Sequence, residues 1–275
     1  MAAHTMRAMR KLGLLALLFV FAACNHVPAE PTGNRLETTP RHDEWVAVES
    51  AGRPLHLYVV YPQSSTKSGA VIVIHENRGL TDWVRTVADK LAENGYIAVA
   101  PDMLSGSAPG GGRTKDFPSE DAAREAISKL PREQVLADLA ATAGYARSIP
   151  SMNGKLAVGG FCWGGSRTWD AANTIDTLTA AYPFYGTGPT TEEGVAGIEA
   201  PVYGFYGGDD ARVNATIETS KALMDKAGKT FEPVIYPGAG HAFMRLGELP
   251  DGTEANRKAH AEAWSRWLAL LRAID

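Results

Sequence analysis

The run Lys155-Leu-Ala-Val-Gly-Gly-Phe-Cys-Trp-Gly-Gly-Ser166 constrains the fold of this chain more than any other stretch. Residues 156–158 are apolar and predict a buried strand, and a helix-like segment follows from Ser166. Between them lies Gly160-Phe-Cys-Trp-Gly164, which is the G-x-S-x-G pattern with cysteine in the serine position. In such an elbow a sharp strand-to-helix turn lifts the central side chain clear of the sheet, and glycines flank it because a Cβ would clash with neighbouring backbone. The pattern predicts Cys162 as a nucleophile at a helix N-terminus, where unpaired N–H groups favour a thiolate.

Composition sets the size and class of the protein. A chain of 275 residues with a net charge of -4 and 45% hydrophobic residues fits one α/β domain of roughly 250 residues. The mild acidity argues against a nucleic-acid partner, which requires a basic face. With Cys24 and Cys162 as the two cysteines, a disulfide framework is excluded. The alternative for Cys162 is a buried free cysteine beside a glycine-rich loop, so the rest of the chain has to decide between the two interpretations.

The N-terminus has the features of an export signal. Basic residues precede the apolar run 12–21, which has the length of a signal-peptide core and is shorter than the roughly 20 residues of a membrane span. The tetrapeptide Phe21-Ala-Ala-Cys24 resembles a bacterial lipobox, so we predict a signal peptide over residues 1–23 and lipidation of Cys24. Ordinary cleavage near Ala23, giving a soluble periplasmic protein, is the alternative. In both cases we expect an exported protein, with membrane contact only through a lipid at Cys24.

The segment after the leader is predicted to be a tether. Residues 24–41 contain several prolines and no apolar periodicity, which is typical of a flexible linker. We therefore expect a single folded domain over residues 42–275.

In that domain, short apolar runs alternate with amphipathic segments. The predicted strands are residues 44–49, 55–61, 69–74, 96–100, 156–158, 179–185, 201–206 and 231–236. The predicted helices are residues 81–94, 119 onward, 131–148, 166 onward, 214–226 with Asn214 as its cap, and 254–274. This alternation predicts a mostly parallel sheet covered by helices on both faces, with the first two strands as an N-terminal antiparallel hairpin. Residues 105–119 are rich in Gly, Pro and Ser and are predicted to be a long loop that covers the site as a lid.

Three residues capable of nucleophilic chemistry follow predicted strands in the order Cys162, Asp210, His241. Nucleophile, acid and histidine occur in this order in the α/β-hydrolase fold, and sites in parallel sheets lie at the carboxyl ends of strands. His241 would exchange a proton with Cys162, and Asp210 would orient the imidazole. The neighbouring Asp209 is the alternative acid. Taken separately, residues 207–210 could be a turn with solvated acids and His241 a surface histidine, but their joint placement favours catalysis.

An anionic intermediate would need two preorganised N–H donors. The backbone N–H of Trp163, directly after the nucleophile, is the first candidate. The second would come from the loop that follows the strand 69–74, where Asn77 is the candidate.

With these residues in place, the chain resembles the dienelactone hydrolase family. The resemblance spans roughly residues 69–267 and rests on Ile74-His-Glu-Asn-Arg-Gly79, Val99-Ala-Pro-Asp102, Gly160-Phe-Cys-Trp-Gly-Gly165, Gly207-Gly-Asp-Asp-Ala-Arg-Val213 and Pro237-Gly-Ala-Gly-His-Ala-Phe243. A cysteine in the elbow combined with a glutamate in the first loop is its most specific part.

The resemblance implies several residue roles. Asp210 would be the acid, and Glu76 would hold the resting thiol protonated until substrate binds. Arg245 would bind a substrate carboxylate, and the alignment of a second family arginine with Arg124 is left open because the intervening loop differs in length. Arg78 adds a cation that the founding pattern lacks, and we predict that it contacts substrate.

Two other departures from the founding pattern concern the substrate. Trp163 replaces a smaller aliphatic residue, and the chain has an export signal where the founding members are cytoplasmic.

These features predict an enzyme that hydrolyses small esters or lactones through a thioester acyl-enzyme, acting as a monomer without a cofactor. A carboxylesterase or thioesterase of cell-envelope acyl groups is the second hypothesis, and a non-catalytic binding lipoprotein is the third. A metal site is not expected, because His75, Glu76 and His241 lack the spacing of known zinc motifs.

Overall fold

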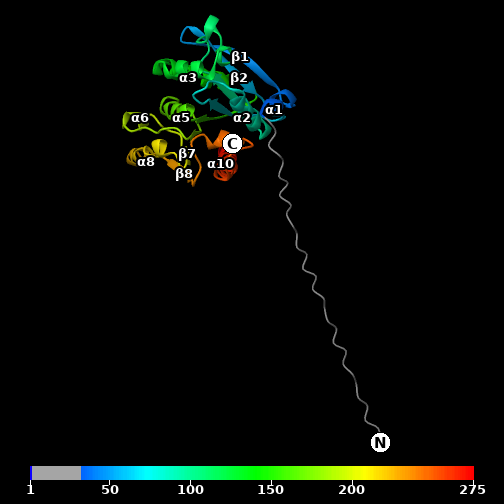
Figure 1. The fold of residues 1–275 in the computed structure, drawn as a ribbon, viewed down its shortest axis with the longest axis vertical. Coiled ribbons are helices and arrows are strands. Elements are labelled where there is room, and N and C mark those ends of the chain that lie inside the picture. Colours follow the sequence, from blue (N-terminus) through cyan, green and yellow to red (C-terminus); the bar gives the residue numbers. More distant parts are fainter. Residues whose placement is uncertain (2–31) are drawn as a thin grey trace.

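The computed structural model describes Met1 and residues 32–275 (Figure 1). The predicted signal peptide beyond Met1, the predicted lipidation site Cys24 and the first part of the predicted tether lie outside the described residues. Among the helices that are described, none is both long enough and apolar enough to cross a membrane.

Strands and helices alternate along most of the described chain. The strands are β1 (Asp43–Ser50), β2 (Arg53–Val60), β3 (Ser68–Ile74), β4 (Ile97–Asp102), β5 (Met152–Phe161), β6 (Ala180–Phe184), β7 (Val202–Gly207) and β8 (Phe231–Tyr236). The helices are α1 (Thr32–Thr38), α2 (Asp82–Glu93), α3 (Glu120–Ser128), α4 (Arg132–Ser148), α5 (Trp163–Thr174), α6 (Glu193–Ala196), α7 (Ala211–Asn214), α8 (Ile217–Lys226), α9 (Phe243–Leu246) and α10 (Glu254–Ile274). Two short 3-10 turns, η1 (Pro109–Gly111) and η2 (Thr114–Asp116), lie in the loop that follows β4.

The strands form one sheet in the order β1-β2-β4-β3-β5-β6-β7-β8. β1 pairs antiparallel with β2 and β2 antiparallel with β4, while every later pair is parallel. The prediction of a mostly parallel sheet with an N-terminal antiparallel hairpin is confirmed. Because the parallel strands share one direction, the loops after β3, β5, β7 and β8 meet at one edge of the sheet.

Both faces of the sheet are buried, which explains why its central strands are apolar without interruption. In β3, Ile72 and Ile74 point into one core cluster, while Val71 and Val73 point into the other. Successive side chains of a strand alternate between faces, so a strand covered on both sides needs apolar residues at every position. At about 25 cal/mol per Å², each fully buried Val or Ile contributes roughly 2 kcal/mol to folding.

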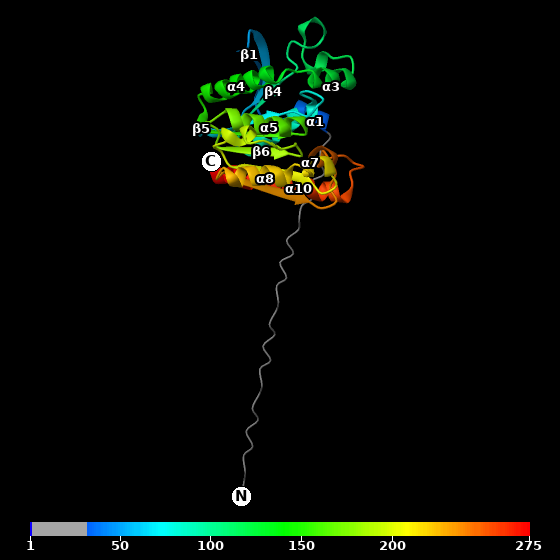
Figure 2. The ribbon, with the colours of Figure 1, turned by 90° about the vertical axis from the view of Figure 1, so that its left-hand side faces the viewer.

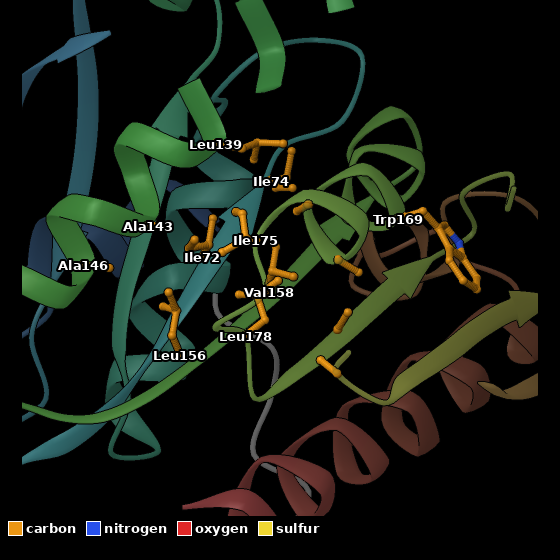
Figure 3. Close-up of a cluster of buried hydrophobic side chains, with 14 of the residues drawn as sticks. Ile72, Ile74, Leu139, Ala143, Ala146, Leu156, Val158, Trp169, Ile175 and Leu178 are labelled. Carbon is orange, nitrogen blue, oxygen red and sulfur yellow. The ribbon is translucent and has the colours of Figure 1, made fainter. Parts of the chain in front are cut away.

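The helices divide between the two faces (Figures 1 and 2). Residues of α4, α5, α6 and α8 join the first cluster, and residues of α2, α9 and α10 join the second. Figure 3 shows the first cluster, where Leu139, Ala143 and Ala146 of α4 face Ile72 and Leu156 of the sheet. The expectation of helices on both faces is therefore confirmed.

The predicted tether differs from the structure at its C-terminal end. Residues 32–38 form α1, and Arg35 and Arg41 bind the carboxylate of Asp89 on α2 with N–O distances of 2.6 and 2.7 Å. Burial raises the pKa of Asp89, but hydrogen bonds from Arg41 and Thr39 and the two guanidinium charges outweigh it and hold the pKa below its ordinary value. Residues 35–41 are thus attached to the domain by long-range ion pairs, which apolar periodicity does not reveal.

The helix predicted to start at Asn214 is divided in two. Asn214 is the last residue of α7, and α8 begins at Ile217. The Asn214 side-chain amide donates to the carbonyl oxygen of Gly207 at 2.8 Å. Its polar side chain therefore fixes the turn after β7 and does not cap the following helix.

Candidate active site

Cys162 occupies a strained turn between β5 and α5. Its backbone has φ 56° and ψ -112°, and its N–H donates to the carbonyl oxygen of Phe184 at 3.0 Å. A Cβ at Gly160 would overlap the carbonyl of Gly164, and a Cβ at Gly164 would overlap the backbone of Ile74 and His75. The two flanking glycines are therefore needed for the close approach of three backbone segments, and a residue held in this unfavourable conformation is typical of a functional site.

The thiol, an imidazole and a carboxylate form a continuous hydrogen-bonded row. Nε2 of His241 lies 3.0 Å from Sγ of Cys162, and Nδ1 of His241 lies 2.5 Å from Oδ2 of Asp210. Asp210 is buried, while the His241 side chain keeps 32% of its exposure. The structure thus brings together three residues that are 31 and 79 positions apart in the chain.

The loops after β7 and β8 are hydrogen-bonded to each other, which fixes this geometry. The N–H of Gly208 donates to Tyr236 and the N–H of Asp209 donates to Ala239, at 2.8 and 2.9 Å. The side chain of Asp209 is exposed, whereas Asp210 points to the imidazole. Of the two adjacent acids, Asp210 is the one positioned to orient His241.

The surroundings of His241 favour its protonated form. Burial lowers the pKa of His241, but hydrogen bonds to Cys162 and Asp210 and the negative charges at both positions raise it to about 9. An imidazole with this pKa carries a proton at neutral pH. A cation next to the sulfur stabilises the thiolate, so the arrangement can form a thiolate–imidazolium pair.

Backbone strain is concentrated near the site, after β5, β6 and β8. Among the described residues other than glycine, positive φ values occur at Ala51, Cys162, Tyr185 and Ala242, and the last three adjoin the site. Tyr185 follows β6 and places its ring centroid 5.2 Å from that of His241 in an edge-on arrangement. Strained residues persist only where surrounding structure holds them, so these strand ends are held in place by their packing.

Trp163 is the first residue of α5, and its N–H therefore has no acceptor within the helix. Its indole stacks on His75, with ring centroids 5.5 Å apart and planes 13° apart. Asn77, the second predicted donor, lies on the loop after β3 and lines the same cavity as Cys162. The two predicted donor segments thus line the same cavity as the nucleophile.

The buried side chain of His75 holds the loop after β3 in place. Its Nδ1 lies 2.7 Å from the carbonyl oxygen of Glu76, and its Nε2 accepts the N–H of Met103 at 3.3 Å. Burial lowers the pKa of His75, consistent with one ring nitrogen donating and the other accepting. The histidine connects the loop that carries Asn77 to the turn after β4, and its ring supports Trp163.

A cavity of about 390 Å³ opens onto the sulfur of Cys162, and we call it the nucleophile cavity. Its described lining consists of Asn77, Arg124, Ile127, Ser128, Cys162, Trp163, Ser166, Arg167, Tyr185, Thr187 and Arg212. Three of these residues are arginines and none is an acid. Arg124, the candidate for the second family arginine, therefore lines the same cavity as Cys162.

Glu76 and Arg245 face a second hollow of about 250 Å³, which we call the acidic hollow. Nε of Arg245 lies 2.8 Å from Oε2 of Glu76, and Oε1 of Glu76 is buried with no hydrogen-bond partner in the described part of the chain. In this arrangement the thiol is hydrogen-bonded to His241 and Glu76 to Arg245, and the masking of the thiol by Glu76 stays a prediction. Arg245 is already paired and does not line the nucleophile cavity.

Arg78 and the loop predicted as a lid are both held by contacts outside the nucleophile cavity. Arg78 lines the acidic hollow and binds Glu120 of α3 at 2.7 Å. The loop 105–119 is held against the loop after β3 through Thr114, which donates its hydroxyl to Asp102 and accepts the N–H of Leu80. The wall of the nucleophile cavity comes from α3 instead, because this helix, and not the loop, presents side chains to it.

Sequence patterns did not indicate several residues of the cavity wall, among them Arg167, Tyr185, Thr187 and Arg212. Arg212 lies within the motif used for the resemblance, in which only the acid has a predicted role. Tyr185 is the last residue of a predicted strand, and this place at the carboxyl end of a parallel strand could have indicated a site residue.

The sheet order, the elbow and the row Cys162–His241–Asp210 define an α/β-hydrolase fold. Solved structures support this class. A crystal structure from Klebsiella pneumoniae named "Putative Dienelactone Hydrolase" superposes with a TM-score of 0.73 at 29% identity, covering 84% of this chain and 98% of that one. An acylaminoacyl peptidase from Pyrococcus horikoshii shares the fold at a TM-score of 0.64 and 13% identity, covering 85% of this chain and 42% of that one.

Sequence comparison identifies the family. The dienelactone hydrolase family pattern matches residues 55–274, so this chain belongs to the dienelactone hydrolase family. It is 34% identical over 231 residues to an Escherichia coli (strain K12) protein named "Putative carboxymethylenebutenolidase", covering 78% of this chain and 83% of the relative. A Yersinia pestis protein of the same name is 33% identical over 220 residues, with 76% and 81% covered. The predictions of the family, of the fold and of an enzyme that hydrolyses ester bonds are confirmed.

Proposed function

We propose that this protein hydrolyses small esters or lactones with Cys162 as nucleophile, His241 as proton carrier and Asp210 as the residue that orients the imidazole. The observation that carries the proposal is the row of contacts at 3.0 and 2.5 Å from sulfur to imidazole to carboxylate, beside a cavity large enough for a small acyl compound. Nucleophile, base and orienting acid within hydrogen-bond reach are the geometric signature of covalent acyl transfer.

In the acylation half-reaction, the Cys162 thiolate attacks the carbonyl carbon of the substrate and the carbonyl electrons move to oxygen. The N–H of Trp163 and a donor from the segment of Asn77 stabilise the resulting oxyanion. When the tetrahedral intermediate collapses, the C–O bond of the ester breaks and the departing alkoxide takes the proton from Nε2 of His241. The alcohol leaves, or in a lactone stays attached to the acyl chain, and a thioester remains on Cys162.

In the deacylation half-reaction, neutral His241 takes a proton from water at Nε2 while the oxygen attacks the thioester carbon. The second tetrahedral intermediate collapses by expelling the Cys162 thiolate, and the carboxylic acid product leaves. Asp210 keeps Nδ1 of His241 as the donor throughout, so that Nε2 always faces the reacting atoms.

Replacement of the nucleophile tests the proposal. We expect Cys162→Ala to lower kcat/KM for para-nitrophenyl butyrate by about 10³-fold or more, because the covalent route is lost. Iodoacetamide should inactivate the wild type and modify Cys162, and His241→Ala should slow this modification because the imidazolium no longer stabilises the thiolate. Hydrolysis by Cys162→Ala at the wild-type rate, in a protein with an unchanged circular dichroism spectrum, would exclude the proposed nucleophile.

A further inference from the structure

The imidazole of His75 has two hydrogen-bond partners, and both are backbone groups. The carbonyl oxygen of Glu76 lies 2.7 Å from Nδ1, and the N–H of Met103 lies 3.3 Å from Nε2. A carbonyl oxygen can only accept and an N–H can only donate, so Nδ1 must carry the proton and Nε2 must be the acceptor. The side chain is buried, and this burial lowers the pKa of His75, so the ring stays neutral and in this one tautomer.

The hydrogen bond from His75 acts on the peptide group that joins Glu76 to Asn77. A trans peptide group is planar, so its carbonyl oxygen and its N–H point in opposite directions. Fixing the carbonyl oxygen of Glu76 therefore fixes the direction of the N–H of Asn77. The N–H of Gly79 also donates to this oxygen, at 3.4 Å, so two donors hold the peptide group in one orientation.

The N–H of Asn77 is left free for a ligand. It has no acceptor among the described residues, and Asn77 is exposed and lines the nucleophile cavity together with Cys162. The loop also touches the elbow, because a Cβ at Gly164 would overlap the carbonyl oxygen of His75. A backbone donor at this place is positioned to meet an oxyanion that forms next to the sulfur.

The same imidazole contacts the residue that supplies the other predicted donor. The indole of Trp163 stacks on the ring of His75, with the two planes 13° apart. Because Trp163 begins α5, the direction of its N–H is set by the start of that helix, against which the His75 ring packs. One buried ring is therefore hydrogen-bonded to one donor segment and stacked against the other.

We propose that His75 is a positioning residue of the oxyanion hole, which holds the N–H groups of Asn77 and Trp163 in the directions that converge on one oxygen. The proposal rests on the proposed function and adds to it a residue that touches neither the substrate nor the sulfur, since His75 is absent from the described lining of the nucleophile cavity. Donors stabilise an oxyanion most when their direction is fixed before the reaction, because no reorganisation is then needed as charge develops.

Two reactions of one sulfur separate this role from a general loss of structure. Hydrolysis of para-nitrophenyl butyrate passes through an oxyanion, whereas iodoacetamide alkylates sulfur by displacing iodide from a saturated carbon and forms no oxyanion. Both reactions use the Cys162 thiolate and the imidazolium of His241. The quantity measured is the ratio of kcat/KM for hydrolysis to the second-order rate constant of alkylation.

Variants of His75 change its hydrogen bonds and its ring stacking separately. His75→Phe keeps a ring against Trp163 but removes both hydrogen bonds, so we expect the ratio to fall about 10- to 100-fold, with the loss in kcat and little change in KM. His75→Gln offers an amide N–H to Glu76 and an amide oxygen to Met103, so it should retain most of the ratio. If His75→Phe does not fold, His75→Met, which has no donor and is flexible enough to fill the space, takes its place.

The matched control is His260→Phe on α10. Nδ1 of His260 lies 2.8 Å from the carbonyl oxygen of Met244, which is the same kind of contact outside the described lining of the nucleophile cavity. A fall of the ratio in His75→Phe or His75→Met that His75→Gln restores supports the proposal.

An unchanged ratio in the variants without a donor, or an equal fall in His75→Gln or in His260→Phe, would overturn the positioning role. Failure of the proposed function gives a different result. If Cys162 were not the nucleophile, the wild-type protein would still hydrolyse the ester after its sulfur had been alkylated.

Discussion

The nucleophile cavity and the acidic hollow lie on either side of residues 76–77, yet their charges are opposite. The nucleophile cavity contains three arginines and no acid, whereas the acidic hollow contains Glu76, Asp82, Glu120 and Glu248 against Arg78 and Arg245. In the acidic hollow both arginines are paired with glutamates at 2.7 and 2.8 Å. The arginines of the acidic hollow are therefore paired with acids that line the same hollow, whereas no carboxylate stands among the described residues that line the nucleophile cavity.

The largest expected effect distinguishes the roles of the adjacent acids Asp209 and Asp210. Asp210→Asn should lower kcat by about 10³- to 10⁴-fold, because the amide no longer holds His241 in the reactive orientation. Asp209→Asn is the matched control and should stay within about twofold of wild type, because the Asp209 side chain is exposed and outside the hydrogen-bonded row. Steady-state kinetics on para-nitrophenyl butyrate checks both. Equal losses in the two variants would mean that the acid acts through general electrostatics and not through its contact with Nδ1.

The next prediction tests whether Arg245 stabilises the buried carboxylate of Glu76. Arg245→Gln should lower the free energy of unfolding by about 2 kcal/mol, since it leaves the buried carboxylate of Glu76 without its cation. Urea unfolding measures this quantity, with Arg257→Gln, an exposed arginine bound to backbone carbonyls, as control. An unchanged free energy of unfolding in Arg245→Gln would show that the buried carboxylate of Glu76 does not depend on this cation.

The smallest effect is a pH dependence at the nucleophile cavity. Because the pKa of His241 is raised to about 9 in the folded protein, its stabilising contribution is complete below the unfolded value of about 6.5 and is lost as the pH rises through about 9. The contribution is about 1 kcal/mol, since the side chain is one-third exposed and solvent screens its charge. Urea unfolding at about pH 6 and about pH 9.5 should show a larger difference for the wild type than for His241→Gln. The same difference in both proteins would show that the pH dependence arises elsewhere.

Local patterns were sufficient for the strands and the elbow. The apolar run at β3 and the glycines around Cys162 reflect burial on both faces and close backbone approach, which act on residues adjacent in sequence. The attachment of residues 35–41 could not be predicted in this way, because it depends on Asp89, about 50 positions away. The ion pairs of Arg78 and Arg245 could not be predicted for the same reason, since their partners Glu120 and Glu76 come close to them only through the fold.

The sequence by itself determined the class of this protein: a strand–Gly-x-Cys-x-Gly–helix unit, followed by an acid and a histidine at later strand ends, is consistent with a single arrangement of a parallel sheet. Only the tertiary structure decided which of Asp209 and Asp210 faces the histidine, and which arginines line the cavity beside the nucleophile. The physical reason is that hydrophobic periodicity records how each element is buried, whereas the surroundings of a charged side chain depend on elements far apart in sequence, such as α3, α5 and α7 around the nucleophile cavity.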